Sequence, residues 1–399
     1  MANSRGSSAP CVCLCYAGMM CLAIAVNLIP VILTTLSTAL GGAAGFTNEQ
    51  LGRILAATFV GLVAGIVVTG PLADRLGAKP FAALGNVLVA AGLAVLGTAR
   101  SYPAVLAAAF TMGAGAGVLD LVLSPIVAAL QPDRRTSAMN WLHSFYSIGA
   151  VGTILVASLA PSLGIGWRAL ALAFVAIPGL LGLGFLGARV PPLVAEGTER
   201  MRLRSLCRER YFLAALAAIF LGGATELGMA QWLPAYAEKG LSYTTWAGGM
   251  AFLGFSVAMA VGRVAAGVMG HRVGGVRLMV GSSSLAAVLY LIASFAPWRP
   301  VALGACVAMG LAVSCLWPSM LATTADRFPR GGASMFGMLA AAGNFGGIAM
   351  PWAIGVVADR SSMPLGLAVT TLCPVAMAVL LFGMRGRPSS RGTNGGKSS

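Results

Sequence analysis

Long apolar runs alternate with short polar segments along the whole chain. Each run has the roughly 20 residues that a helix needs to cross about 30 Å of hydrocarbon. Because backbone groups in the bilayer core must be paired within the chain, and because the runs are too long for barrel strands, we expect helices. The pattern predicts an all-α membrane protein with twelve transmembrane helices, at residues 13–37, 51–71, 80–99, 102–130, 140–160, 167–188, 211–235, 246–269, 278–297, 299–325, 335–358 and 363–384.

Basic residues are distributed unevenly between the two sides of these spans. The loops of one side, together with both tails, hold 19 of the 26 Lys and Arg residues, the opposite loops hold six, and Arg263 lies inside a span. Loops rich in Lys and Arg stay in the cytoplasm. We therefore predict a multi-pass protein of the cell inner (plasma) membrane with both termini in the cytoplasm.

Composition agrees with a membrane location, since 58% of the residues are hydrophobic and 9% are charged. The net charge of +15 is explained by topology, so no nucleic-acid partner is expected. The sequence contains no nucleotide-binding loop, no cluster of residues at metal-ligand spacing and no Ser/His/Asp arrangement. We predict neither an enzyme nor a bound cofactor or metal, and the Cys-rich start of the first span is interpreted as apolar helix.

An internal repeat divides the chain. The segment GPLADRLG at 70–77 matches GVMGHRVG at 267–274, and SPIVAALQPDR from Ser124 matches WPSMLATTADR from Trp317. This predicts two pseudo-symmetric six-helix bundles, at residues 1–189 and 211–385, joined by a cytoplasmic central loop at 190–210 and followed by a disordered cytoplasmic tail at 386–399. Repeated halves of this kind are typical of transporters whose site lies at mid-membrane between the halves.

The segment GPLADRLGAK resembles the signature loop of the major facilitator superfamily, and the span count and the repeat agree with that resemblance. The resemblance implies the major facilitator fold. In physical terms, Asp74 can accept hydrogen bonds from helix N-terminal amides and pair with Arg75 or Arg134, in contacts that break when one half rocks against the other. His271 replaces the acid in the second copy. The residues expected to take part in gating are Gly70, Asp74, Arg75, Gly77, Arg134, Arg272, Asp326 and Arg327.

Spans four, five and seven resemble those of the fucose permease type of sugar:proton symporters. The matching segments are GAGAGVLDLVLSPIVAAL, MNWLHSFYSIGAVG and GGATELGMAQWLPAYAEKGLS. In that group an acid follows a small-residue run in span four, a His opens span five, and a Glu precedes Trp-Leu-Pro in span seven. The resemblance carries these features over to Asp120, His143, Glu226 and the segment 232–234.

Two acids lie deep in the predicted membrane. Asp120 is about 16 Å from the cytoplasmic end of its span, and Glu226 is about 22 Å into its own. A charge at such depth costs roughly 2.5 to 3.5 kcal/mol, so both acids should face an interior and be paired, hydrated or protonated. Gly113, Gly115 and Gly117 precede Asp120 and should let a neighbouring helix approach closely. Asp120 has no acidic counterpart in the second half, where Val313 takes its position.

Other polar and aromatic side chains within the spans are candidates for binding a solute. Arg263 can pair with one of the acids or with an anionic substrate, or it can serve as a snorkelling or packing residue. Hydroxyl-rich solutes need polar partners and a flat aromatic face. Pro30, Pro234, Pro318 and Pro351 and the glycine pairs 222/223 and 346/347 mark places where helices can kink or break. The candidate partners are Asn27, Asn140, Tyr146, Gln231, Trp232, Tyr236, Trp317 and Asn344.

These features predict a secondary active transporter that works by alternating access as a monomer. We expect it to take up a small hydrophilic solute, such as a monosaccharide, together with protons, with the lipid bilayer as its other partner. Asp120 and Glu226 are the leading residues for proton coupling or substrate binding. Two alternatives stay open: proton-driven efflux of amphipathic compounds, and a membrane sensor that does not transport.

Overall fold

The computed structural model describes residues 5–130, 135–190, 203–328 and 332–384, and every regular element in this part of the chain is a helix. Twelve of its helical spans are long and apolar enough to cross a membrane, which confirms the predicted fold class. The first half comprises α1 (Arg5–Leu40), η1 (Gly42–Ala44), α2 (Asn48–Leu76), α3 (Ala78–Thr98), α4 (Tyr102–Leu130), α5 (Arg135–Leu159), η3 (Ala160–Leu163) and α6 (Trp167–Gly187). The short α7 (Leu203–Leu206) precedes the second half, which comprises α8 (Arg210–Lys239), α9 (Thr245–Val273), α10 (Gly275–Phe295), α11 (Arg299–Val313), α12 (Leu316–Arg327), α13 (Gly332–Arg360), α14 (Met363–Ala368), η4 (Val369–Thr371) and α15 (Leu372–Met384).

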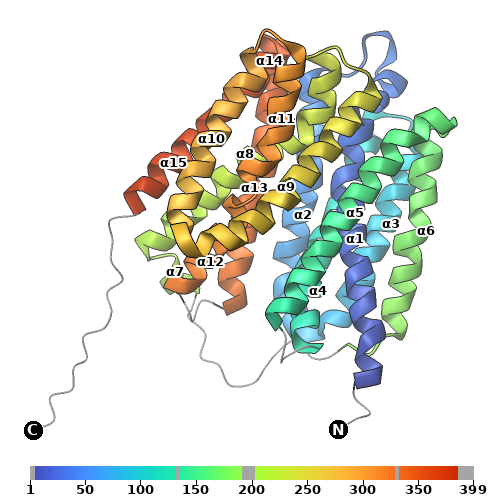
Figure 1. Ribbon diagram of the computed structural model, residues 1–399. Coiled ribbons are helices and arrows are strands. Elements are labelled where there is room, and N and C mark those ends of the chain that lie inside the picture. The colour runs from blue at the N-terminus through green and yellow to red at the C-terminus, as the bar shows by residue number, and fades with distance from the viewer. Residues whose placement is uncertain (1–4, 131–134, 191–202, 329–331, 385–399) are drawn as a thin grey trace, which may run out of the picture.

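The two halves stand side by side, with α1 to α6 in blue to green and α8 to α15 in yellow-green to red (Figure 1). They meet where α2 packs against α13, α5 against α9, and α1 against α8. We call the face at which α1, α8 and α13 end the distal face, at the top of Figure 1. The opposite face, at which α1 begins and toward which α15 runs, is the terminal face.

Glycine contacts bring α4 against its neighbours, as predicted. A Cβ atom on Gly113 or Gly117 would overlap a backbone carbonyl of α2, that of Thr58 or Leu62 respectively, and one on Gly115 would meet the backbone of α3. The second half repeats this contact, since Gly310 of α11 lies on the carbonyl of Phe255 in α9. Gly117 and Gly310 are 193 residues apart, and the carbonyls on which they lie, those of Leu62 and Phe255, are also 193 residues apart. The repeat seen in the sequence therefore extends to backbone packing.

The structure divides the tenth span into α11 and α12 directly before Pro318, one of the prolines at which a kink or break was expected. Pro318 has no N–H for the carbonyl of Ser314, four residues earlier. Proline alone is not sufficient, since Pro125 occupies the matching position inside the continuous α4. Ser314 also donates its own hydroxyl to the carbonyl of Leu311 at 2.7 Å, a local bond that competes with the helix.

Helical structure continues through the other prolines at which a kink or break was considered. Pro30, Pro234 and Pro351 all lie inside unbroken helices. The glycine pairs serve as packing contacts between α8 and α13, where Gly223 meets Gly343 and Gly346 meets Ala224.

We predict that Gly117→Ala destabilises the protein. The added methyl group has to displace α2 from α4, and overpacking of this kind costs about 1–3 kcal/mol. Thermal unfolding of the purified protein in detergent should show a Tm several degrees lower. Gly179→Ala is the matched control, because nothing lies within 4 Å of a Cβ at that position in α6. Equal stability of the two variants would contradict the close contact.

Candidate functional site

A cavity of about 40 Å³ lies between the halves, against α1 and α5 on one side and α8 and α9 on the other. This volume has room for a few water molecules, so a larger solute requires the surrounding helices to separate. Its wall combines hydrogen-bonding groups with aromatic and aliphatic side chains. The lining residues are Val26, Asn27, Tyr146, Ser147, Ala150, Glu226, Leu227, Ala230, Gln231, Phe252, Phe255, Ser256 and Met259.

Tyr146 stands at the polar centre of this cavity. Asn27 of α1 donates its amide Nδ2–H to the Tyr146 hydroxyl at 3.4 Å and to its own-helix carbonyl of Ala23 at 2.8 Å. The Tyr146 ring is close enough to Asp120, Glu226 and Arg263 to interact with all three charges electrostatically. Both deep acids of the sequence, one on α4 of the first half and one on α8 of the second, therefore lie within electrostatic range of Tyr146.

Glu226 and Arg263 form an ion pair inside the second half. The Glu226 Oε1 and Arg263 Nη2 atoms are 3.7 Å apart, and the side chains are 14% and 34% exposed. This distance is beyond a hydrogen bond, so the pair is loose. The Nε atom of Arg263 is buried, and no partner for it lies among the described residues. Of the roles considered for Arg263, pairing with an acid is the one that the structure contains.

Asp120 and His143 flank the cavity without lining it. Asp120 is partly exposed on α4, three residues after the glycine that packs on α2. His143 lies one turn before Tyr146 on α5 and interacts electrostatically with Arg263 of the other half. Val313, the second-half counterpart of Asp120, is fully buried.

Other predicted binding residues lie away from the cavity, with the exception of Gln231, which is buried in its wall. Trp232 is fully buried, and its indole Nε1 donates to the carbonyl of Pro351 at 2.8 Å. Tyr236 donates its hydroxyl to the carbonyl of Ala293 at 2.6 Å. The amide of Asn344 donates to the carbonyl of Ala340 in its own helix at 3.0 Å.

Trp317 packs its ring on Gly343 of α13, which again is a contact between helices of the second half. The side chain of Asn140 lies outside the described residues. Sequence reasoning missed the apolar wall formed by α9. The sequence pattern that could have predicted this wall is the spacing of Phe252, Phe255 and Met259. Together with Arg263 they recur every three or four residues and so share one helix face.

The comparisons with known proteins agree with this architecture. A profile of the Major Facilitator Superfamily matches residues 15–255 and 247–398, and thus nearly the whole chain. The chain belongs to the Major Facilitator Superfamily. Members of this superfamily are transporters and not enzymes, so the chain is a multi-pass membrane transport protein.

Two relatives and one solved structure illustrate how far the similarity to other members of the superfamily extends. The "Probable nitrate/nitrite transporter NarK2" of Mycobacterium tuberculosis is 24% identical over 366 residues, which cover 87% of this chain and 89% of the relative. The "Gentisate transporter" of Corynebacterium glutamicum is 26% identical over 376 residues, covering 87% and 82%. The crystal structure of the E. coli fucose:proton symporter covers 96% of this chain and 100% of its own, with a TM-score of 0.66 and 20% identity, a likeness of fold.

The signature loop of the superfamily is described here only in part. Gly77 has a φ of 80°, a conformation that favours glycine, and it joins α2 directly to α3. Gly70 lies beside Leu121 of α4. Arg327 places its guanidinium 5.5 Å from the centre of the Tyr211 ring, and Asp326 is exposed. Arg134 and the side chains of Asp74, Arg75 and Arg272 lie outside the described residues.

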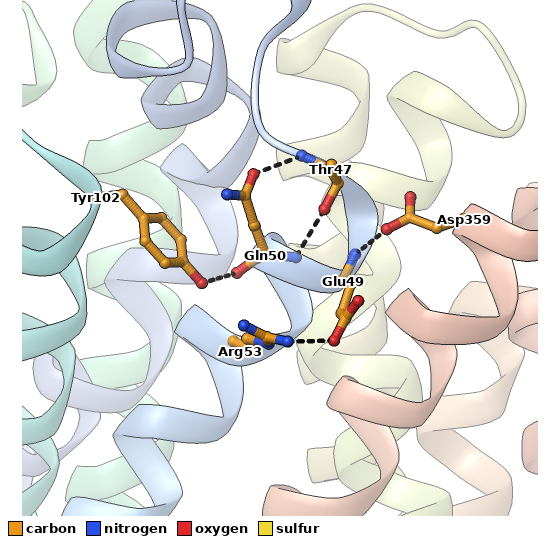
Figure 2. A network of polar contacts seen from close by, with 6 residues as sticks. All are labelled: Thr47, Glu49, Gln50, Arg53, Tyr102 and Asp359. Carbon is orange, nitrogen blue, oxygen red and sulfur yellow. Dashed lines mark hydrogen bonds and ion pairs between the residues drawn. The ribbon is translucent and has the colours of Figure 1, made fainter.

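A second polar cluster joins the two halves at the distal face, where Asp359 of α13 meets the start of α2 (Figure 2). At the end of α13, Asp359 accepts hydrogen bonds from the first two backbone N–H groups of α2, those of Asn48 at 2.8 Å and Glu49 at 2.6 Å. A carboxylate at a helix N-terminus also interacts favourably with the helix dipole. Nearby, Thr34 of α1 donates to Glu238 of α8 at 2.9 Å.

Asp359 directly follows the predicted span at 335–358, and no role was expected for it from the sequence. The signal was nevertheless present, because GVVADR at 355–360 repeats the Gly-x-x-Ala-Asp-Arg pattern of GPLADR at 70–75. The two segments end α13 and α2, the helices that pack against each other across the halves.

We predict that Asp359→Ala opens the distal face. Loss of a helix cap costs about 1 kcal/mol, which shifts the closed-to-open ratio by about fivefold. Spin labels at residues 38 and 244, in a background without the exposed Cys13 and Cys207, should report a larger share of long distances. Glu49→Gln is the control, because it removes the exposed ion pair with Arg53 but keeps the backbone N–H. An unchanged distance distribution in Asp359→Ala would contradict a closing role.

Proposed function

We propose that this protein is a secondary active transporter that carries a small polar solute together with protons through the cavity between its halves. The observation that carries the proposal is the convergence of Asn27, Tyr146 and Glu226 on one cavity. Arg263 pairs with Glu226 beside it, and Asp120 is within electrostatic reach of Tyr146. Elements of both halves contribute to it, as alternating access requires. Two membrane carboxyl groups supply sites that can hold a proton.

Orientation follows from the distribution of basic residues in the sequence. With both termini in the cytoplasm of the cell inner membrane, the distal face lies outside. The contacts of Asp359 and Glu238 then hold the cavity closed toward the outside. We propose a monomer as the working unit, since twelve spans from one chain surround the site.

The nature of the solute is constrained by two kinds of evidence. Two relatives that match most of this chain are named as a probable nitrate/nitrite transporter and a gentisate transporter, and all of these solutes are anions. The monosaccharide expected from the sequence has a weaker basis, because the sugar symporters among the solved structures share only the fold. The transport experiment therefore includes both classes of solute.

The test is counterflow in proteoliposomes with labelled sugars and labelled organic acids, with and without a pH gradient. Exchange of either class, enhanced by acid on the side from which solute enters, supports proton-coupled symport. Exchange enhanced by acid on the opposite side favours the efflux alternative. Absence of exchange for any solute at any gradient would overturn the transport proposal and favour the sensor.

We predict that Asp120→Asn separates exchange from accumulation. An amide keeps the size of the side chain but cannot gain or lose a proton, so counterflow should continue while uptake driven by the pH gradient falls to equilibration. Glu209→Gln is the matched control, because Glu209 is an exposed acid just before α8. Full gradient-driven accumulation by Asp120→Asn would show that the coupling proton is held elsewhere.

A further inference from the structure

We infer that the cavity binds an organic anion whose carboxylate takes the place of Glu226 at Arg263, with the body of the anion against Phe252, Phe255 and Met259. This inference rests on the proposed function, because it names the class of solute and the residue that selects it. It assigns to Arg263 a binding role and to Glu226 the role of an internal competitor.

The first argument is the unfilled hydrogen-bonding capacity of Arg263. A guanidinium carries five N–H donors in a planar fork. Among the described residues its ionic partner is Glu226, whose oxygen lies 3.7 Å away, and the buried Nε–H is without an acceptor. Buried unpaired donors are unfavourable, and a carboxylate is the group whose two oxygens match the fork. A ligand carboxylate can therefore accept hydrogen bonds from those N–H groups of Arg263 that Glu226 leaves unpaired.

The second argument is the position of Arg263 on α9. Long side chains on a helix lie over the turn that precedes their own Cα, which directs Arg263 toward Met259 and the cavity. Phe252 and Phe255 continue the same face, with ring centres 6.3 Å apart. A flat or apolar body extending from the carboxylate thus meets an aromatic wall. Ser256 shares that wall and offers a hydroxyl to a polar substituent.

The third argument is charge balance. Glu226 and Arg263 together are neutral, so a bound anion adds one negative charge to a site of low polarity. When Glu226 takes up one proton from solution, its carboxylate is neutralised and Arg263 is left to pair with the ligand. The other titratable groups within electrostatic reach of the pair are Tyr146 and His143, and Tyr146 in turn is within reach of Asp120. One anion thereby binds with one proton, and the net charge of the site is unchanged.

The inference is tested by binding measurements on the purified full-length protein in detergent. The probe is gentisate, and 2,5-dihydroxybenzamide is its neutral isostere. We expect wild-type protein to bind the acid more tightly than the amide. Arg263→Gln should weaken the binding of gentisate by at least about tenfold, which is the effect of losing a charged hydrogen bond. The same variant should leave the binding of the amide unchanged. Glu226→Gln should strengthen the binding of gentisate, because it removes the carboxylate that competes with the ligand for Arg263.

Two further variants guard against trivial explanations. Arg53→Gln is the matched control, since Arg53 also pairs with a glutamate, Glu49, but lies exposed on α2 away from the cavity. It should bind both probes like wild type. Arg263→Lys keeps the positive charge without the fork and should retain part of the affinity, with an unfolding temperature near that of wild type.

Three results would overturn the inference. These are equal weakening of acid and amide by Arg263→Gln, no effect of that variant on gentisate, and failure of wild-type protein to bind any of gentisate, benzoate and 4-hydroxybenzoate in the millimolar range. If a neutral sugar then still undergoes counterflow, the transporter function stands and only the anion site fails. If gentisate binds at Arg263 but no solute is exchanged, the site stands and the transport proposal fails.

Discussion

Helices in a bilayer gain nothing by burying apolar surface against each other, because lipid tails are equally apolar, so their association depends on close packing. In this protein that packing is made by glycines that lie directly on neighbouring backbone, as Gly117 does on α2. Such a contact fixes the rotation of the helix that carries it. Asp120 follows Gly117 by three residues, and Arg263 follows Gly262, which packs on α11. The charged groups are thus oriented by the packing of small residues beside them.

Much of the fold was predictable from sequence, because membrane spans obey a simple length and polarity rule. The twelve helices and the depth of Asp120 and Glu226 followed from it, whereas the superfamily followed from the resemblance of GPLADRLGAK to its signature loop. Pairing of Arg263 with one of the deep acids was among the predicted roles, but the choice of Glu226 was not, since it depends on how α8 and α9 are rotated toward each other. Trp232 illustrates the same limit: a buried indole needs an acceptor, and the sequence does not tell a ligand from the carbonyl of Pro351.

The two halves share their backbone packing but contribute different polar side chains to the site. The first half contributes Asp120, Asn27 and Tyr146, and the second half contributes the ion pair of Glu226 and Arg263. At the position that matches Asp120, the second half has a buried valine close to the break between α11 and α12. The helix contacts are therefore repeated in both halves, while the side chains that can touch a solute or hold a proton differ between them.

The cap that Asp359 places on α2 has a mechanical consequence. α2 is a single helix of 29 residues, about 43 Å long, with no break along its length. A rigid helix of that length moves as one body. A contact that holds its distal end therefore also sets the angle at which its other end meets the terminal face. Because α13 lies alongside and is of equal length, a change in the contact at the distal end of α2 also alters how the two helices are placed at the terminal face.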